Sequence, residues 1–517
     1  MRALSVVGLL LPLLGAQEPG GAAPTAAQLP ELGAPAALPD GAPAQLATVT
    51  RQLLQKHAYW LADDARKGRF TGSASQQATA EYVAEQFAAL GLQPLGDKKT
   101  FFQWYPLEQL VLHGSSGIEV GGQTITDLGV LPAGDTKKLS ASGKLTWCGA
   151  ALEDDLPGTL KGKVPVVLLS RNPRGLGPVA DMGAMQRYND IARRLSKLDA
   201  KVGVVVVAGD ASKYGDSLNY HAVMPDHPLH AFGSDKSHFK PLQLPLVIVS
   251  QQSAAPLLDA LGVKFADGEV IAPTEPSKVN AKVTLRLDTQ KKGRACNVVA
   301  VLEGTSRKHE ALVFSAHHDH IGRRVDGDSF NGADDNASGT SGLLTIAEAF
   351  AKGERPTRSV VFLSVSGEEL GLWGSAWFAD NPTWPLDRIV ADVNIDMIGR
   401  AVKTAEGCSI QITPSKDHDK YSSLGRAAAQ LAPKFGVSFT SGDQYYARSD
   451  HYNFAKKGVP VVFLCDGEHP DYHKVTDSAD RLDYVSMEAV ARLAFWTGWQ
   501  VADGKDKPQE LGKQSDW

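Results

Sequence analysis

Histidines and carboxylates with the spacing of a metal site follow an apolar run near residue 311. In the stretch 311–339, ALVFSAHHDHIGRRVDGDSFNGADDNASG, His317 and Asp319 are two residues apart. On an extended strand such side chains point to the same side, which suits a metal-binding imidazole beside a carboxylate that orients it. An isolated H-x-D pair is a weak signal, because a core histidine beside a polar loop gives the same pattern.

Further groups of this kind follow the next apolar runs and strengthen the hypothesis. They are Asp335, next to Asp334 in a Gly-flanked turn, Glu368 and Glu369 after SVVFLSVSG, Asp396 in VNIDMIG, and Tyr472 and His473 after VVFLC. Two histidines and three carboxylates suit two divalent ions that share one bridging aspartate. Two such ions can polarise a carbonyl and hold a hydroxide between them.

The adjacent glutamates predict two different roles. Neighbouring residues on an extended chain point in opposite directions, so Glu369 can face a metal while Glu368 faces the bound water. Glu368 would then be a general base beside the nucleophile that it activates. An acidic pair is usually a solvated surface feature, but this pair follows an apolar run.

The elements that carry these groups indicate the fold class. From residue 296 onward, β-rich apolar runs alternate with helical segments, which predicts an α/β fold. We expect a doubly wound, mostly parallel mixed sheet with helices on both faces. Active sites of such sheets lie at the carboxyl ends of the strands, where all the groups above are placed.

Before this region the hydrophobic pattern of the chain changes twice. Residues 45–97 have helical periodicity, whereas residues 101–288 contain short apolar runs at 164–170, 202–209 and 244–250, which indicate a small mixed β/α domain. A loop of that domain contains His221, His227, His230 and His238. Histidine-rich tracts can bind metal, but these spacings match no standard site, so we predict a solvated loop near a cleft.

The composition indicates which partners the protein can bind, and the N-terminal segment indicates its localisation. A net charge of -5 and a pI of about 6.3 give no reason to expect nucleic acid or anionic membranes as partners. Residues 1–16 are predicted to be a signal peptide, because the apolar segment Ala3–Leu14 is too short to span a membrane. No later segment is long enough either, so we expect an exported protein, periplasmic or secreted, without stable membrane insertion. The four cysteines, Cys148, Cys296, Cys408 and Cys465, have no metal-site spacing; buried free thiols fit as well as bridges.

Taken together, the motifs A-H-x-D, N-G-A-D-D-N-A-S-G, G-E-E-x-G, N-x-D-M-I-G and D-Y-H-x-x-x-D over residues 316–477 resemble those of a known family. This is the co-catalytic zinc exopeptidases of clan MH, of the bacterial leucyl aminopeptidase type. The resemblance implies two Zn²⁺ ions, one bound by His317, Glu369 and Asp335, the other by Asp335, Asp396 and His473. It also implies Glu368 as the base, Asp319 as the partner of His317, and Tyr472 as a group that helps to polarise the scissile carbonyl.

The segment YYARSDHYNF, residues 445–454, also resembles the family. It makes Arg448 and Asp450 candidates for substrate binding, although a buried loop ion pair explains both residues equally well. His318, His320, His451 and His469 lie close enough in sequence to compete as ligands, but they do not align with ligand positions of the family.

A weaker resemblance concerns the domain organisation. Residues 105–285 resemble a protease-associated domain that gates substrate, through LKGKVPVVLLSRNP, AKVGVVVVAGD and QLPLVIVS. The peptidase domain would then consist of residues 41–104 and 286–503. An Ala/Pro-rich leader without a core, residues 17–40, would precede it, and a polar tail, residues 504–517, would follow.

The function that these resemblances imply is a secreted dizinc aminopeptidase. It would act on peptides with a free N-terminus through a metal-bridging hydroxide and a glutamate base; no oligomeric state is predicted. Three alternatives stay open: a carboxypeptidase of the same superfamily, a glutaminyl cyclase-like acyltransferase with one zinc, and a pseudo-peptidase that binds partners without catalysis.

Overall fold

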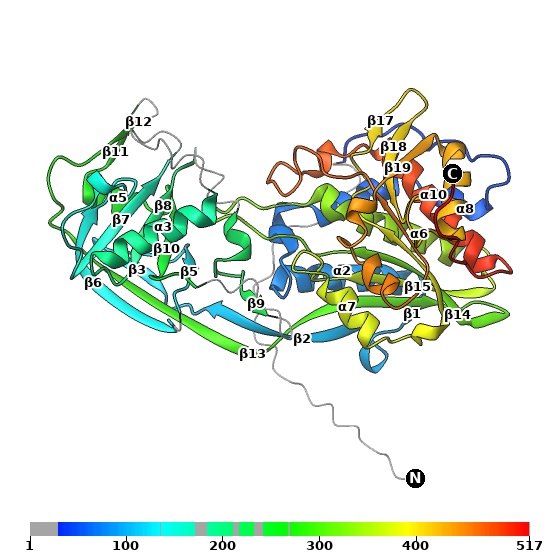
Figure 1. Cartoon of the computed structure of the whole chain (residues 1–517), viewed down its shortest axis with the longest axis horizontal. Helices are drawn as coiled ribbons and strands as arrows, with labels where there is room; N and C mark the ends of the chain where they lie inside the picture. The colour runs from blue at the N-terminus through cyan, green and yellow to red at the C-terminus, as the bar shows by residue number, and fades with distance from the viewer. Residues whose placement is uncertain are drawn as a thin grey trace, which may run out of the picture.

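The protein has two lobes that lie side by side along its longest axis (Figure 1). The structure, a computed structural model, describes residues 29–134, 136–170, 183–209, 217–231, 241–266 and 269–515. The predicted signal peptide and His238 lie outside these residues. No helix of the described segments is long and apolar enough to cross a membrane.

The larger lobe, which we call the catalytic lobe, is built on a mixed sheet. Four parallel strands form its centre in the order β15 (Arg358–Val365), β14 (Arg307–His317), β16 (Ile389–Ile395) and β20 (Val461–Cys465). Antiparallel strands flank them: β13 (Asn280–Leu302) beside β15, and β18 (Cys408–Thr413) beside β20. β19 (Val437–Ser441) lies beyond β18, β17 (Val402–Lys403) pairs with the first residues of β18, and β1 (Gln93–Pro94) pairs with β13.

Helices cover both faces of this sheet, and the predicted α/β fold class is confirmed. Along β14, Leu312 and Phe314 join one core cluster while Ala311 and Val313 join another, because successive side chains on a strand point to opposite faces. The first face packs on α1 (Arg51–Leu61), α2 (Ala74–Ala89), α6 (Gly339–Lys352), α8 (Ser423–Leu431) and α10 (Tyr484–Asp503). The second packs on α7 (Trp373–Asp380) and α9 (His451–Ala455).

The smaller lobe, which we call the inserted lobe, has a sheet of its own. The three apolar runs noted in the sequence form its parallel strands β7 (Lys163–Leu169), β8 (Gly203–Val207) and β10 (Leu246–Ser250). The other strands are β3 (Gly117–Val120), β4 (Gln123–Ile125), β5 (Gly129–Leu131) and β6 (Lys138–Trp147). Two helices, α3 (Ala184–Lys197) and α5 (Ala255–Leu261), contribute to separate cores on its two faces.

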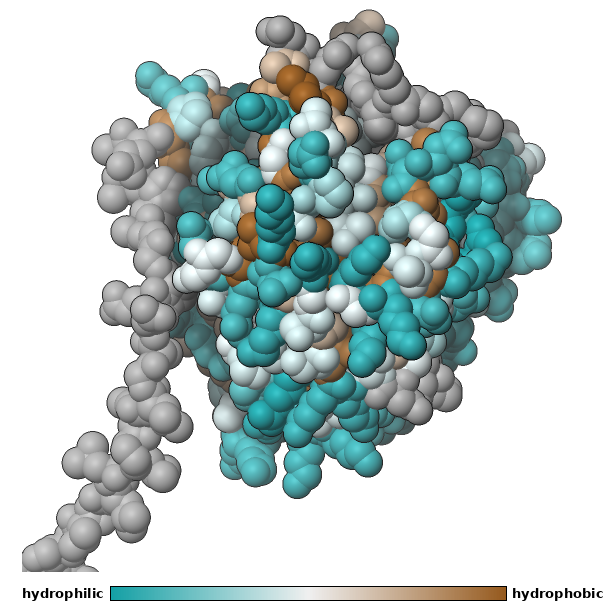
Figure 2. All heavy atoms as spheres, turned by 90° about the vertical axis from the view of Figure 1, so that its left-hand side faces the viewer, coloured by the Kyte–Doolittle hydropathy of each residue, from teal (hydrophilic) through white to brown (hydrophobic). Residues whose placement is uncertain are grey.

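The free end of the inserted lobe is mostly polar. Figure 2 shows hydrophilic side chains over most of its described surface, with hydrophobic side chains scattered between them. The exposed hydrophobic residues include Phe265 and Ile271, on the hairpin of β11 (Lys264–Ala266) and β12 (Glu269–Ile271). Such isolated residues are ordinary at a protein surface.

Two long strands join the lobes. β13 pairs with β6 and β3 of the inserted lobe near its start and with β15 near its end, and β2 (Phe102–Leu112) pairs with β13 between them. The proposed domain limits at 104/105 and 285/286 therefore fall inside continuous strands. A third strand, β9 (Leu229–Ala231), comes from the inserted lobe and pairs with β2.

The histidine-rich loop lies at this junction, and the prediction of a solvated loop is wrong for two of its residues. His227 and His230 are only 2% and 1% exposed. The His227 ring stacks on Phe70 of the catalytic lobe at a centroid distance of 3.6 Å. His230 Nε2 donates a hydrogen bond to the Thr71 carbonyl at 2.6 Å. The loop is thus an interlobe contact.

The ends of the described chain also pack on the catalytic lobe. Residues 30 and 36 of the predicted leader contact this lobe, because Arg492 donates a hydrogen bond to Ala36 O and Gln55 donates one to Pro30 O. In the tail, Lys507 forms an ion pair with Glu310 at 2.8 Å. The four cysteines are buried free thiols.

Candidate active site

The candidate ligands gather at the carboxyl edge of the catalytic sheet. They come from four neighbouring strands: His317 is the last residue of β14, Glu369 lies in the turn after β15, Asp396 follows β16, and His473 lies in the loop after β20. Asp335 belongs to the irregular turn Ala333–Ser338, which leads into α6. Parallel strands place their carboxyl ends on one edge, so residues far apart in the chain meet there.

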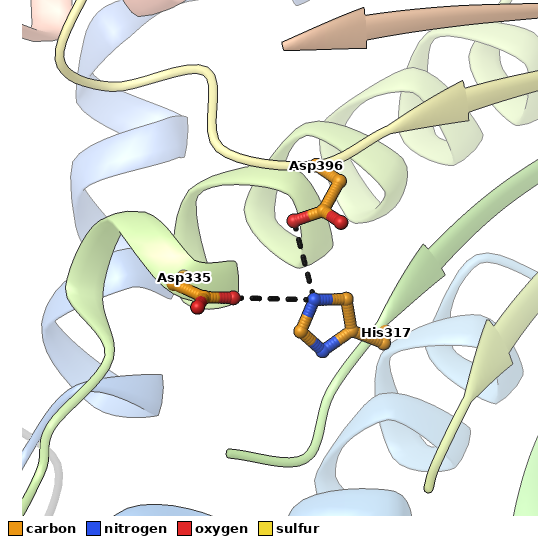
Figure 3. A group of neighbouring side chains, drawn as sticks. All are labelled: His317, Asp335 and Asp396. Atoms are coloured by element: carbon orange, nitrogen blue, oxygen red, sulfur yellow. Dashed lines mark hydrogen bonds and ion pairs between the residues drawn. The ribbon is translucent and has the colours of Figure 1, made fainter. Parts of the chain in front are cut away.

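The first group of ligands is His317, Asp335 and Asp396, whose polar atoms converge (Figure 3). His317 Nε2 lies 3.3 Å from Asp335 Oδ1 and 3.2 Å from Asp396 Oδ1. The other oxygen of Asp396 accepts a hydrogen bond from Ser449 Oγ at 2.7 Å. Ser449 belongs to the segment YYARSDHYNF, and its contact with a ligand is a role that the sequence did not indicate.

The second group contains Asp335 again, now with Glu369 and His473. His473 Nε2 lies 3.0 Å from Asp335 Oδ2 and 3.2 Å from Glu369 Oε2. The two carboxylate oxygens of Asp335 therefore face different histidines, His317 and His473. This is the arrangement that a bridging carboxylate between two ions requires.

The composition of the two groups differs from the one that the resemblance implied. We expected His317 to share an ion with Glu369, and Asp396 to share one with His473, which follows the order of these residues along the chain. That grouping is wrong because β16 lies beside β14 in the sheet. Asp396 therefore lies next to His317, and the loop after β20 brings His473 to Glu369.

A further histidine, His320, lies at the second group. His320 Nδ1 is 2.6 Å from Glu369 Oε1, and His320 satisfies the geometry of a ligand set with Asp335 and Glu369. We set this residue aside in the sequence because it does not align with a ligand position. Its spacing in H-H-D-H and its position directly after a buried strand were the available signals. His320 and His473 thus both contact Glu369.

Asp319 connects the first group to the adjacent turn. Its backbone carbonyl accepts a hydrogen bond from His317 Nδ1 at 3.2 Å, and its carboxylate lies 3.6 Å from the same nitrogen. The carboxylate also accepts hydrogen bonds from Thr71 Oγ1 at 2.6 Å and from the Glu368 amide at 3.4 Å. Asp319 therefore orients His317 and positions the Glu368 backbone.

Buried charges hold the backbone around the site. The guanidinium of Arg69, which is fully buried, donates to the carbonyls of Leu61, His318, Asn331 and Gly332. Asp477, the last residue of the D-Y-H-x-x-x-D motif, accepts hydrogen bonds from the amides of Asp334 and Asp335. The motif therefore contributes His473 to the ligands and Asp477 to the turn that presents Asp335.

Glu368 and Glu369 occupy a turn, not the extended chain on which we based their separation. Gly367 has φ +75°, and the Glu368 carbonyl accepts from the Gly371 amide at 2.9 Å. The turn still separates the two carboxylates, since Glu369 contacts His320 and His473. Burial raises the pKa of Glu368 well above its usual range; His317 opposes this, and the carboxylates of Asp396 and Glu369 add to it.

The charges of the ligands indicate that a cation fits between them. Burial alone would lower the pKa of His473, but the carboxylates of Glu369 and Asp335 raise it to about 10. Burial would likewise lower the pKa of His317, yet Asp396 and Glu368 hold it well above its usual range. Convergent buried carboxylates thus attract positive charge from whichever group is nearby. Imidazole nitrogens and carboxylate oxygens are donors that suit zinc.

Of the two residues predicted to bind substrate, Arg448 lines a pocket and Asp450 is buried. Arg448 and Tyr472 line a pocket beside Glu368, and the Tyr472 ring stacks on His473 at a centroid distance of 3.9 Å. Asp450 is completely buried, and burial raises its pKa to about 7. The alternative of an ion pair between Arg448 and Asp450 is wrong, because Arg448 pairs with Glu468 at 2.7 Å.

Comparison with known proteins gives a family match over the region that contains every candidate ligand. Residues 297–497 match Peptidase family M28. Aminopeptidase YwaD of Bacillus subtilis is 25% identical over 266 residues, which are 50% of this chain and 54% of that protein. Leucine aminopeptidase 2 of Arthroderma otae is 24% identical over 430 residues, 80% of this chain and 71% of that protein.

A solved structure of a bacterial enzyme shares this fold. The zinc aminopeptidase BSAP from Bacillus subtilis superposes with a TM-score of 0.53 and 18% identity, covering 88% of this chain and 95% of that one. This likeness supports the fold alone. In sequence, the chain spans about half the length of the first curated relatives, such as 54% of YwaD.

Proposed function

Because residues 297–497 match Peptidase family M28, we propose that this protein is a zinc aminopeptidase of that family and that it holds two zinc ions. The observation that carries the proposal is the position of Asp335. Its Oδ1 faces His317 and its Oδ2 faces His473, so one carboxylate serves two ligand groups. His317 and Asp396 would hold one ion, and Glu369 and His473 the other.

The ions, when bound, would polarise the scissile carbonyl and lower the pKa of a water between them. Glu368 borders the same pocket as Asp335 and Asp396, and it would take the proton from that water and pass it to the leaving amine. The turn that holds Glu368 is fixed through Asp319 and Thr71. Tyr472 lies at the pocket wall, where its hydroxyl could contact the carbonyl oxygen.

The charges at the pocket favour an aminopeptidase over a carboxypeptidase. Among the described residues that line it, Arg448 is the one cation, and its pairing with Glu468 neutralises it. A carboxypeptidase needs an available cation for the substrate carboxylate. The carboxylates of the described lining, Asp335, Glu368, Asp396 and Glu468, outnumber this cation, and such a lining suits the ammonium group of a free N-terminus.

The other two alternatives fit the site less well. A cyclase-like enzyme with one zinc would have no use for a carboxylate that faces two histidines. A pseudo-peptidase would have no reason to keep Glu368 beside complete ligand groups. We also propose export to the periplasm or medium, on the basis of the apolar segment near the N-terminus, and a protease-associated domain at residues 105–285.

A panel of dipeptides tests this function. The purified protein, loaded with zinc, is assayed on free, N-acetylated and C-amidated forms of one dipeptide, with Glu368→Gln as the matched inactive variant. Hydrolysis of the free and C-amidated forms, but not of the N-acetylated form, is expected. Hydrolysis of the N-acetylated form with rejection of the C-amidated one would replace the proposal with a carboxypeptidase. Zinc content measured on the same sample should approach two ions per chain.

A further inference from the structure

The inserted lobe reaches one of the candidate zinc ligands with a tyrosine. Tyr220 ends a short 3₁₀ turn, Ser217–Tyr220, of the inserted lobe. Its hydroxyl lies 3.5 Å from His473 Nδ1. The ring packs against the apolar cluster at the lobe junction that includes Phe70, Leu370 and Trp373. The hydroxyl is thus the polar end of a side chain whose ring packs on apolar residues.

His473 is a ligand whose ring needs support from outside its own backbone. Its side chain is 28% exposed, the most exposed among the five ligands of the two groups that share Asp335, and its backbone has φ +53°. The Tyr472 ring covers one face of the imidazole. With Nε2 directed at Asp335 and Glu369, Nδ1 is the atom left to hold the ring at a fixed angle.

We propose that Tyr220 is a positioning residue for the metal centre, acting through His473. A histidine that binds zinc through Nε2 carries its proton on Nδ1 and donates it to an acceptor, which sets the tautomer and the ring angle. The Tyr220 oxygen is placed as that acceptor. The inference rests on the proposed function in one respect, namely that His473 is a zinc ligand.

The position of Tyr220 depends on how firmly the inserted lobe docks. The loop that follows it is fixed to the catalytic lobe by β9–β2 pairing and by the contacts of His227 and His230. The packing leaves no spare room: a Cβ at Gly322 would lie 2.5 Å from the His227 ring, and one at Gly72 would lie 2.8 Å from the His230 ring. Thr71, which binds His230 through its carbonyl, binds Asp319 through its hydroxyl.

The docked lobe is therefore part of the metal centre. Its withdrawal would remove an acceptor from His473 and loosen the segment that positions Asp319. This goes beyond control of substrate access, the role that the resemblance implied for residues 105–285, because it makes zinc affinity depend on contacts between the lobes.

The test compares two tyrosine hydroxyls that each contact a histidine. Tyr220→Phe removes the one at His473, and Tyr82→Phe removes a hydroxyl 2.7 Å from His57 Nδ1, in the catalytic lobe but remote from the ligands. The zinc affinity of each full-length variant is measured by competition with a chromogenic chelator, together with kcat, KM and thermal stability of the metal-free protein. For Tyr220→Phe we expect the affinity of one of the two ions to fall by about 10- to 100-fold.

Tyr82→Phe should bind both ions as the wild type does. A second variant, His227→Ala, keeps Tyr220 but removes the stacking on Phe70. This variant should also have a lower affinity for one of the two ions. Wild-type zinc affinities in both Tyr220→Phe and His227→Ala would overturn the inference. If the wild-type protein itself binds no zinc at His473, the proposed function fails instead, and the two failures are distinguishable because zinc binding is measured without substrate.

Discussion

The two lobes contain the same kind of sheet but differ at the ends of their strands. In the inserted lobe, β7, β8 and β10 are parallel, buried and flanked by helices. Their carboxyl ends carry Ser170, Ala208 and Ser250. The corresponding ends of β14, β15, β16 and β20, with the loops and the turn that follow them, carry two histidines and three carboxylates of the candidate site. The architecture thus supplies a place for chemistry, and the residue types at the strand ends decide whether chemistry occurs there.

The largest effect should come from the residue that both ligand groups share. Asp335→Ala removes an oxygen from each group, so we expect zinc content to fall from about two ions per chain to below one and peptidase activity to fall to background. Ser250→Ala, at a strand end of the inserted lobe, is the matched control and should leave both unchanged. Zinc content and peptidase activity are measured on the same preparations. If Asp335→Ala retains two ions per chain, Asp335 does not bridge them.

The second prediction separates the adjacent glutamates within the catalytic lobe. Glu368→Gln should keep both ions and the fold while kcat falls by about 10²–10⁴-fold, the usual contribution of a positioned base. Glu369→Gln should lose zinc from one site, with partial recovery of activity in added zinc. A Glu368→Gln variant that keeps its kcat with full zinc occupancy would show that another group takes the proton.

The third prediction decides between the two histidines that contact Glu369. If His473 is the ligand, His473→Ala should abolish binding of one ion. His320→Ala should lower the affinity for that ion by only about 10- to 100-fold, as for a residue that orients a ligand. Chelator competition measures both. The reverse order of effects would make His320 the ligand and would move the site closer to β14.

The last of these predictions is on stability and again concerns the catalytic lobe. Burial, with a smaller contribution from Lys56, lowers the pKa of His57 to about 3. Protonation therefore favours the unfolded chain, where the pKa is near 6.5. The stability that His57 contributes is complete above pH 6.5 and is lost as the pH falls toward 3, by at most about 1.4 kcal/mol per pH unit.

His57→Gln keeps a polar partner for Tyr82 without the titration. The free energy of unfolding of the metal-free protein is measured in urea between pH 7 and pH 4. It should depend less steeply on pH in the variant than in the wild type. If the free energy of unfolding changes equally with pH in the two proteins, His57 keeps its ordinary pKa in the folded state.

Local patterns in the sequence predicted much of this structure. Alternation of apolar runs and helical segments after residue 296 predicted the parallel sheet, because each strand buried on both faces must be nearly all apolar. The three apolar runs before it became β7, β8 and β10. Residue types at the strand ends brought His317, Asp335, Glu369, Asp396 and His473 into one hypothesis, and the structure brings these five side chains together.

The predictions that were wrong depend on how the strands and the lobes are arranged in space. The sequence lists β15 and then β16 after β14, but the sheet places them on opposite sides of β14, which decides that His317 lies with Asp396. Likewise, nothing local in the sequence indicates that Tyr220 reaches His473 or that His227 stacks on Phe70, since these contacts exist only when the lobes dock.

The insertion also sets the order in which the protein can form during synthesis. The Gly367 amide donates to Thr71 Oγ1 across 296 residues of sequence, which a ribosome adding about 5–20 residues per second needs roughly 15–60 s to produce. Until the second half of β13 and then β14 have been made, α1 and α2 have no sheet on which to bury Leu54 and Val83. The inserted lobe, whose own sheet is complete once the first part of β13 has emerged, can fold first. We expect a nascent chain arrested after β13 to resist protease within the inserted lobe and to be cleaved in α1 and α2; equal resistance of both regions would argue against this order.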